Sequence, residues 1–227
     1  MLGTHVLRFA TLLLLLSIAW GCGGTHARPS TSTALRAAPA SAFDLRSDFW
    51  VNLHQRLFME TMPARFRVSP QAGADAFTPD EQTSWNAALA EYRRRIPTRD
   101  PLTPLSDELV SLNQRLASRG SAADLAGTGI DAELTARLEA AAAVYRAHGW
   151  SEDDRSNKEW IRQIEPHLSR LGATIENELI AAYRNPWPPS PIRVEVSAHA
   201  GVLGAYTAGA PDLITAGRCA PAHRHAR

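Results

Sequence analysis

The residue best placed for chemistry is a histidine inside an apolar helical stripe. The stripe has the spacing i, i+3, i+4, i+7 and i+8 and comprises Trp50, Leu53, His54, Leu57 and Phe58. This spacing predicts the buried face of an amphipathic helix over residues 47–62. An imidazole there could serve as a base or a ligand, and Asp48 and Asn52 lie close enough in sequence to fix its tautomer. Burial alone, however, requires only that the ring nitrogens find hydrogen bonds. We therefore interpret His54, Asn52 and Asp48 as a structural polar core.

Other catalytic patterns are missing from the sequence. It contains no Gly-rich phosphate loop and no G-x-S-x-G motif, and none of its eight histidines is four residues from another, as a zinc-binding H-E-x-x-H motif requires. His223 and His225 share a segment with Cys219, but the sequence predicts no scaffold to hold a metal there. We accordingly assign no catalytic residue, no metal ligand and no cofactor.

The N-terminus predicts export and a lipid anchor. An apolar run from Phe9 to Trp20 has the length of a signal-peptide core. The following Ala19-Trp20-Gly21-Cys22 is similar to a bacterial lipobox, although Trp20 replaces the usual small residue. We expect residues 1–21 to be removed, Cys22 to be the lipid attachment site and residues 22–41 to form a tether. A plain secretory signal is the alternative. The predicted partner is a membrane, and the predicted location is the bacterial cell envelope, facing the periplasm or exterior.

The charge balance argues against nucleic acid as a partner. The formal net charge is +1, and loss of Arg8 with the signal leaves none. Binding to nucleic acid relies on an excess of Lys and Arg to neutralise phosphates. The sequence identifies no protein or peptide partner. With Cys22 lipidated, Cys219 has no cysteine with which to form an intramolecular disulfide.

The remaining pattern is mainly helical. Helices are predicted to start at Thr78, Ser106, Asp131 and Ser151, with Pro166 kinking or splitting the last of these, and a further segment to cover residues 173–184. Apolar and polar residues alternate over Ile192–Ser197, as in a strand with one buried face. Residues 201–208 could form the second strand of a hairpin with it. Residues 210–227 are predicted to form an irregular tail. The predicted fold is a mainly α, multi-helix domain over residues 42–209 with a short β-hairpin or partial sheet near the C-terminus, an α+β fragment.

Four segments resemble a family of largely uncharacterised bacterial envelope proteins. They are residues 48–54, 144–148 (Val-Tyr-Arg-Ala-His), 159–161 (Glu-Trp-Ile) and 192–207. The resemblance covers roughly residues 42–209 and implies a helical region, a short sheet and then a zincin-like helix bearing H-E-x-x-H. Because that motif is missing and periodicity is lost after Ala210, we interpret the chain as truncated or out of frame before the metal helix.

Two functional hypotheses follow. The first is a membrane-anchored envelope lipoprotein that is non-catalytic as it stands and has a helical binding or structural domain. The second is the N-terminal portion of a zincin-like zinc metallopeptidase, whose zinc would require the missing helix.

Overall fold

The computed structural model describes residues 42–63, 76–96, 106–199, 205–208 and 213–217. Their helices are α2 (Phe49–Thr61), α3 (Pro79–Arg95), α4 (Asp107–Arg119), α5 (Ala132–His148) and α6 (Trp150–Tyr183). Their strands are β1 (Phe43–Arg46), β2 (Ile192–Ser197), β3 (Ala205–Ala208) and β4 (Leu213–Gly217). This confirms the predicted fold class, a mainly helical domain with a partial sheet near its C-terminal end. Within these residues, no helix is both long and apolar enough to cross a membrane.

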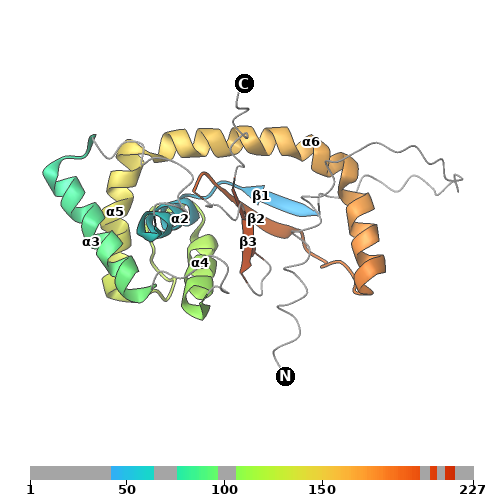
Figure 1. Ribbon diagram of the computed structural model, residues 1–227, viewed down its shortest axis with the longest axis horizontal. Helices are drawn as coiled ribbons and strands as arrows, with labels where there is room; N and C mark the ends of the chain where they lie inside the picture. Colours follow the sequence, from blue (N-terminus) through green and yellow to red (C-terminus); the bar gives the residue numbers. More distant parts are fainter. Residues whose placement is uncertain (1–41, 64–75, 97–105, 200–204, 209–212, 218–227) are drawn as a thin grey trace, which may run out of the picture.

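Helix α2 lies among α3, α4 and α5, and these four helices form the bundle (Figure 1). Their shared core consists of large apolar side chains withdrawn from solvent, chiefly Trp50, Leu53, Leu57, Trp85, Tyr92, Leu116, Leu138 and Tyr145. The stripe predicted from sequence on α2 is buried except for Phe58, which is partly exposed. Burying one such aliphatic side chain contributes about 1.5–3 kcal/mol, so most of the hydrophobic stabilisation resides here.

Side-chain caps set the beginnings of three bundle helices, as the sequence predicted. Thr78 and Glu81 form a reciprocal capping box at α3, in which the carboxylate accepts the Thr78 N–H at 2.8 Å. The side chains of Ser106 and Asp131 accept backbone N–H groups of the first turns of α4 and α5. Each cap satisfies an N–H group that has no partner within its helix.

The sheet has the order β1-β2-β4-β3. Strand β2 is parallel to both neighbours, and β3 runs antiparallel to β4 at the edge. The expected hairpin between β2 and β3 was wrong in its pairing, because β4 lies between them. It was also wrong to assign Leu213–Gly217 to an irregular tail. These five residues carry little pattern of their own, and their strand is defined by pairing with β2.

Helix α6 is one continuous helix of 34 residues with Pro166 inside it. The expectation of two segments was therefore wrong, although the helix axis does change direction towards its C-terminal end (Figure 1). A proline removes the hydrogen bond to the carbonyl four residues earlier, here that of Arg162. Both residues are exposed, so water can bond that carbonyl and the helix can continue.

Strand β1 was missed from the sequence, since Phe-Asp-Leu-Arg is too short to signal a strand. It pairs with β2 from almost 150 residues away, with Leu45 opposite Val194. The predicted signal peptide, Cys22, the tether to residue 41, and Cys219, His223 and His225 lie outside the described residues.

Candidate functional site

His54 lies in the interior of the bundle. Its side chain is fully buried on α2, and its Nδ1 is 2.8 Å from the hydroxyl of Tyr92 on α3. Its Nε2 has no hydrogen-bond partner among the described residues. Burial lowers the pKa of His54 to about 3, because the apolar surroundings disfavour the charged ring. The imidazole is therefore neutral at pH 7, and its tautomer is set by Tyr92 rather than by Asp48 or Asn52.

Asn52 instead connects three elements. Its side-chain amide donates to the carbonyl of Asp48 at 3.0 Å and to the carbonyl of Val196 in β2 at 3.1 Å. Its side-chain oxygen accepts from the amide of Asn157 in α6 at 3.0 Å, and that same amide also reaches Ser47 Oγ at 3.2 Å. Asn52 and Asn157 are both fully buried. This pair therefore ties the bundle to the sheet and to α6.

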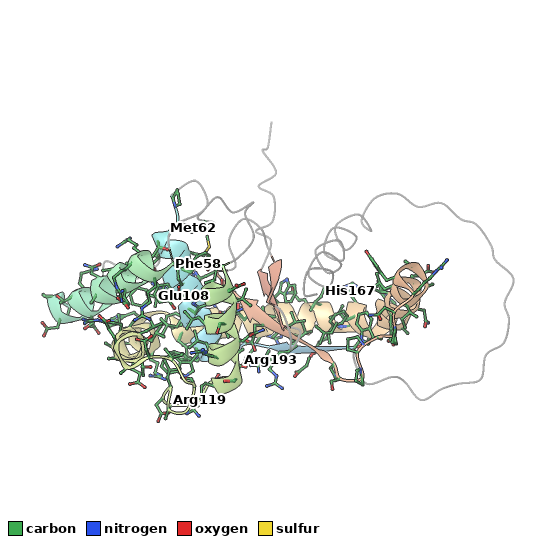
Figure 2. All side chains as sticks on the ribbon, turned by 90° about the horizontal axis from the view of Figure 1, so that it is seen from below. Phe58, Met62, Glu108, Arg119, His167 and Arg193 are labelled. Atoms are coloured by element: carbon green, nitrogen blue, oxygen red, sulfur yellow. The ribbon has the colours of Figure 1, made fainter. Side chains whose placement is uncertain are left out.

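A second group of charges joins the same parts of the fold, and we call it the Arg193 cluster: Arg193, Asp48 and Glu195. Arg193 Nη2 lies 2.8 Å from Asp48 Oδ2, and its Nε lies 2.5 Å from Glu195 Oε1. Nη2 also donates to the carbonyl of Ala117 at the end of α4 at 2.6 Å. Figure 2 shows Arg193 at the place where the bundle meets the sheet.

The carboxyl of Glu195 is the most perturbed acid of this cluster. Its side chain is fully buried, and Oε2 has no hydrogen-bond partner among the described residues. Burial and the nearby charge of Asp48 raise the pKa of Glu195 to about 7, and Arg193 opposes them. Glu195 therefore exchanges its proton near neutral pH.

A third group lies beside α6 and consists of Tyr145, Asp153 and His199. Asp153 Oδ2 accepts the Tyr145 hydroxyl at 2.7 Å and lies 2.8 Å from His199 Nε2. Burial would raise the pKa of Asp153, but the hydrogen bonds from His199 and Tyr145 outweigh it and hold that pKa below its usual value. Burial raises the pKa of the Tyr145 phenol well above its usual value, so it stays protonated.

An imidazole oriented by a carboxylate is an arrangement that suits a general base or a metal ligand. The His199 ring is partly exposed, with 22% of the side chain accessible. This pair was not predicted from the sequence. The histidine is 46 residues away from Asp153, and nothing in the local pattern links the two.

A serine hydroxyl is also bonded to His199, but to its backbone and not to its ring. Ser197 Oγ accepts the backbone N–H of His199 at 3.1 Å. This bond fixes the turn after β2 and leaves the hydroxyl in a structural position. Among the described residues, no three His, Cys, Asp or Glu side chains gather as a metal site.

Comparisons with known proteins give no relative: no family model, no curated protein and no solved structure matches the chain.

Proposed function

We propose that this protein is a lipid-anchored protein of the bacterial cell envelope, whose folded part is a non-catalytic binding or structural domain. The single observation that carries the proposal is Cys22, which follows an apolar run of signal-peptide length and a lipobox-like Ala19-Trp20-Gly21. The first described strand, β1, begins 21 residues after this cysteine, at Phe43. A lipid on Cys22 would hold the fold at a membrane surface without a spanning helix.

The polar groups described above support a structural rather than a catalytic use. Asn52, Arg193 and Asp153 each bond side chains or carbonyls from other elements, so that their polar atoms connect the bundle, α6 and the sheet. Hydrogen bonds of this kind fix the position of one element on another. A rigid frame held near a membrane is suited to presenting a binding surface.

Lipid labelling with a matched pair of cysteine variants tests the anchor. Cells fed a labelled fatty acid should label the wild-type protein and retain it in the membrane fraction. Cys22→Ser should lose both the label and the membrane retention, whereas Cys219→Ser, which removes the other cysteine of the chain, should keep both. Label that persists in Cys22→Ser, or a wild-type protein that is never labelled, would refute the proposal.

The second candidate is the N-terminal portion of a zincin-like zinc metallopeptidase. It is favoured by the order of elements, since helices α2–α6 precede β2, β3 and β4 as the sequence resemblance implies. Sequencing the gene distinguishes the two candidates. The metallopeptidase candidate predicts that the DNA downstream of residue 209 encodes, in another reading frame, a helix with the H-E-x-x-H motif. The absence of such a motif would leave the first candidate.

A further inference from the structure

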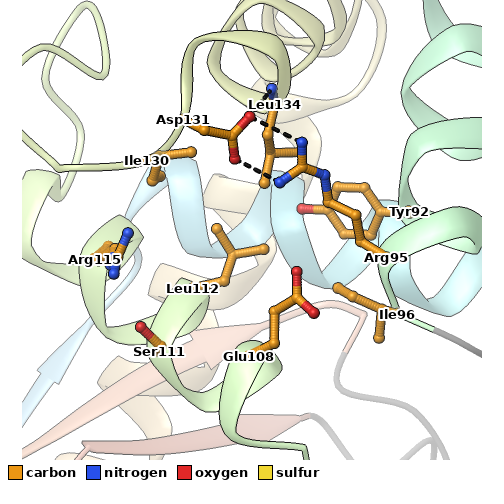
Figure 3. A pocket seen from close by; sticks show the side chains of 10 residues that line it. All are labelled: Tyr92, Arg95, Ile96, Glu108, Ser111, Leu112, Arg115, Ile130, Asp131 and Leu134. Atoms are coloured by element: carbon orange, nitrogen blue, oxygen red, sulfur yellow. Dashed lines mark hydrogen bonds and ion pairs between the residues drawn. The ribbon is translucent and has the colours of Figure 1, made fainter.

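A cavity of about 260 Å³ opens where the end of α3, one face of α4 and the start of α5 meet. Figure 3 shows the side chains around it. Its lining includes the apolar side chains of Ile96, Leu112, Ile130 and Leu134, together with Tyr92. Ligand sites commonly combine such an apolar floor with a few placed polar groups.

Tyr92 is an aromatic side chain of the cavity wall whose orientation is fixed. Its side chain is only 1% exposed and is one of the ten that line the cavity (Figure 3). The hydroxyl is held from behind by His54 Nδ1 at 2.8 Å. Because His54 is neutral, this bond brings no charge to the cavity. The buried histidine of α2 thus fixes the orientation of one side chain that lines the cavity.

The charges at the rim fall into a paired set and an unpaired set. Arg95 is held by the carboxylate of Asp131, with Nη2 2.8 Å from Oδ1, and also contacts Glu91. Arg94 pairs with Glu91 as well, so two arginines and two carboxylates neutralise one another. Glu108 and Arg115 form no ion pair with a described residue, and Arg115 donates to the carbonyl of Gly129 at 2.5 Å. One negative and one positive group therefore remain for a ligand.

The two unpaired charges lie seven residues apart on one face of α4. Two helical turns separate their Cα atoms by about 10 Å along the axis. Ser111 and Leu112 lie between them on the same face, also against the cavity. An extended peptide advances about 3.3–3.6 Å per residue, so roughly three residues cover this distance. A single amino acid carries its two charges on one carbon and is too short.

We propose that the cavity binds a short apolar peptide with free termini, aligned along α4. Its ammonium group contacts Glu108, its carboxylate contacts Arg115, and an apolar side chain occupies the floor formed by Leu112 and Leu134. This assigns a ligand class to the binding domain proposed above. It does not rest on the lipid anchor, so loss of peptide binding and loss of the Cys22 label are separate results.

Calorimetry on the purified full chain tests the assignment with the tripeptide Ala-Leu-Ala, its N-acetylated form and its C-terminal amide. Each blocked form should bind about tenfold more weakly than the free peptide, because each loses a charge-assisted contact. Glu108→Gln should remove the difference between the free and acetylated peptides. Arg115→Gln should remove the difference between the free peptide and the amide.

The controls are Asp107→Asn, which neutralises the acid next to Glu108, and Arg137→Gln, which neutralises an exposed arginine of α5 outside the cavity. Both should keep the full discrimination. No binding of Ala-Leu-Ala to the wild-type chain, or equal binding of all three peptides, would overturn the proposal. So would blocked-peptide differences that survive unchanged in Glu108→Gln and Arg115→Gln. All these substitutions are at exposed or rim positions, and unchanged melting temperatures would show that the fold is intact.

Discussion

The bundle and the sheet are stabilised in different ways. The bundle buries a large set of aromatic and aliphatic side chains, with Trp50, Trp85 and Tyr92 all almost completely withdrawn from solvent. The sheet has a small apolar cluster of its own, in which Ile192 and Val194 are buried against partly exposed neighbours. Apolar burial therefore accounts for the bundle, whereas the sheet depends on its connections to the bundle.

Those connections are polar and bring distant parts of the chain together. Asn52 bonds β2 and α6, and Arg193 in β2 bonds Asp48 and the carbonyl of Ala117 in the last turn of α4. We infer that these bonds make the bundle and the sheet one cooperative unit. Helix α6 extends beyond this region, and Leu171 on its outer part is 44% exposed.

The largest difference is expected between an apolar truncation in the bundle and one on the outer part of α6. Leu53→Ala removes a fully buried side chain from the bundle and should lower the free energy of unfolding by about 2–5 kcal/mol. Leu171→Ala removes a side chain that is nearly half exposed and should change it by less than about 0.5 kcal/mol. Urea denaturation of the two variants measures both values. Equal losses would mean that α6 is packed as tightly as α2.

His54→Ala should destabilise the bundle by roughly 2–4 kcal/mol at pH 7, since it leaves a cavity and removes the partner of the Tyr92 hydroxyl. The folded-state pKa of about 3 lies below the ordinary value of 6.5. The contribution of a neutral His54 is therefore present above pH 6.5 and is lost as the pH falls towards 3. The difference in free energy of unfolding between wild type and His54→Ala should therefore decrease as the pH is lowered. Denaturant titrations at several pH values measure this difference.

His167→Ala is the matched control for this variant, because His167 is exposed on α6 (Figure 2). It should leave stability unchanged at every pH. A loss of function in His54→Ala with an unchanged melting temperature would contradict the structural interpretation of His54.

Glu195→Gln should change the free energy of unfolding with the opposite pH dependence. The change should be smaller than that caused by His54→Ala. The folded-state pKa of about 7 lies above the ordinary value of 4.5. The protonated carboxyl contributes stability below pH 4.5, and this contribution is lost as the pH rises through 7. A glutamine keeps the bond from Arg193 and does not titrate. The variant should gain about 1–3 kcal/mol relative to wild type between pH 5 and pH 8.

Glu178→Gln, an exposed acid of α6, serves as the control and should follow the wild type across this pH range. A difference between wild type and Glu195→Gln that stays constant from pH 5 to pH 8 would show that Glu195 is not held protonated by the fold.

Local patterns in the sequence predicted the bundle well. The stripe around Leu53 and the helix starts at Thr78 and Asp131 all depend on residues within two turns of one another. The sheet was less predictable, because β1 and β4 are short and are defined by pairing with β2 across long stretches of chain.

Long separation in the sequence also explains why the hydrogen-bond partners in the polar clusters were not predicted. The sequence indicated that His54, Asn52 and Asp48 would be polar groups in the core. His54 and Asn52 are fully buried, whereas Asp48 is partly exposed. Their partners Tyr92, Asn157 and Arg193 are 38, 105 and 145 residues away in the respective bonds, beyond any helical spacing.

Native-state hydrogen exchange measures the cooperativity of the two regions most directly. If the polar connections unite them, the amides of β2 and of the middle of α2 should exchange through the same opening, with free energies equal to that of global unfolding. Exchange of the β2 amides at a much lower free energy, while α2 stays protected, would contradict the claim and show that the sheet opens independently of the bundle.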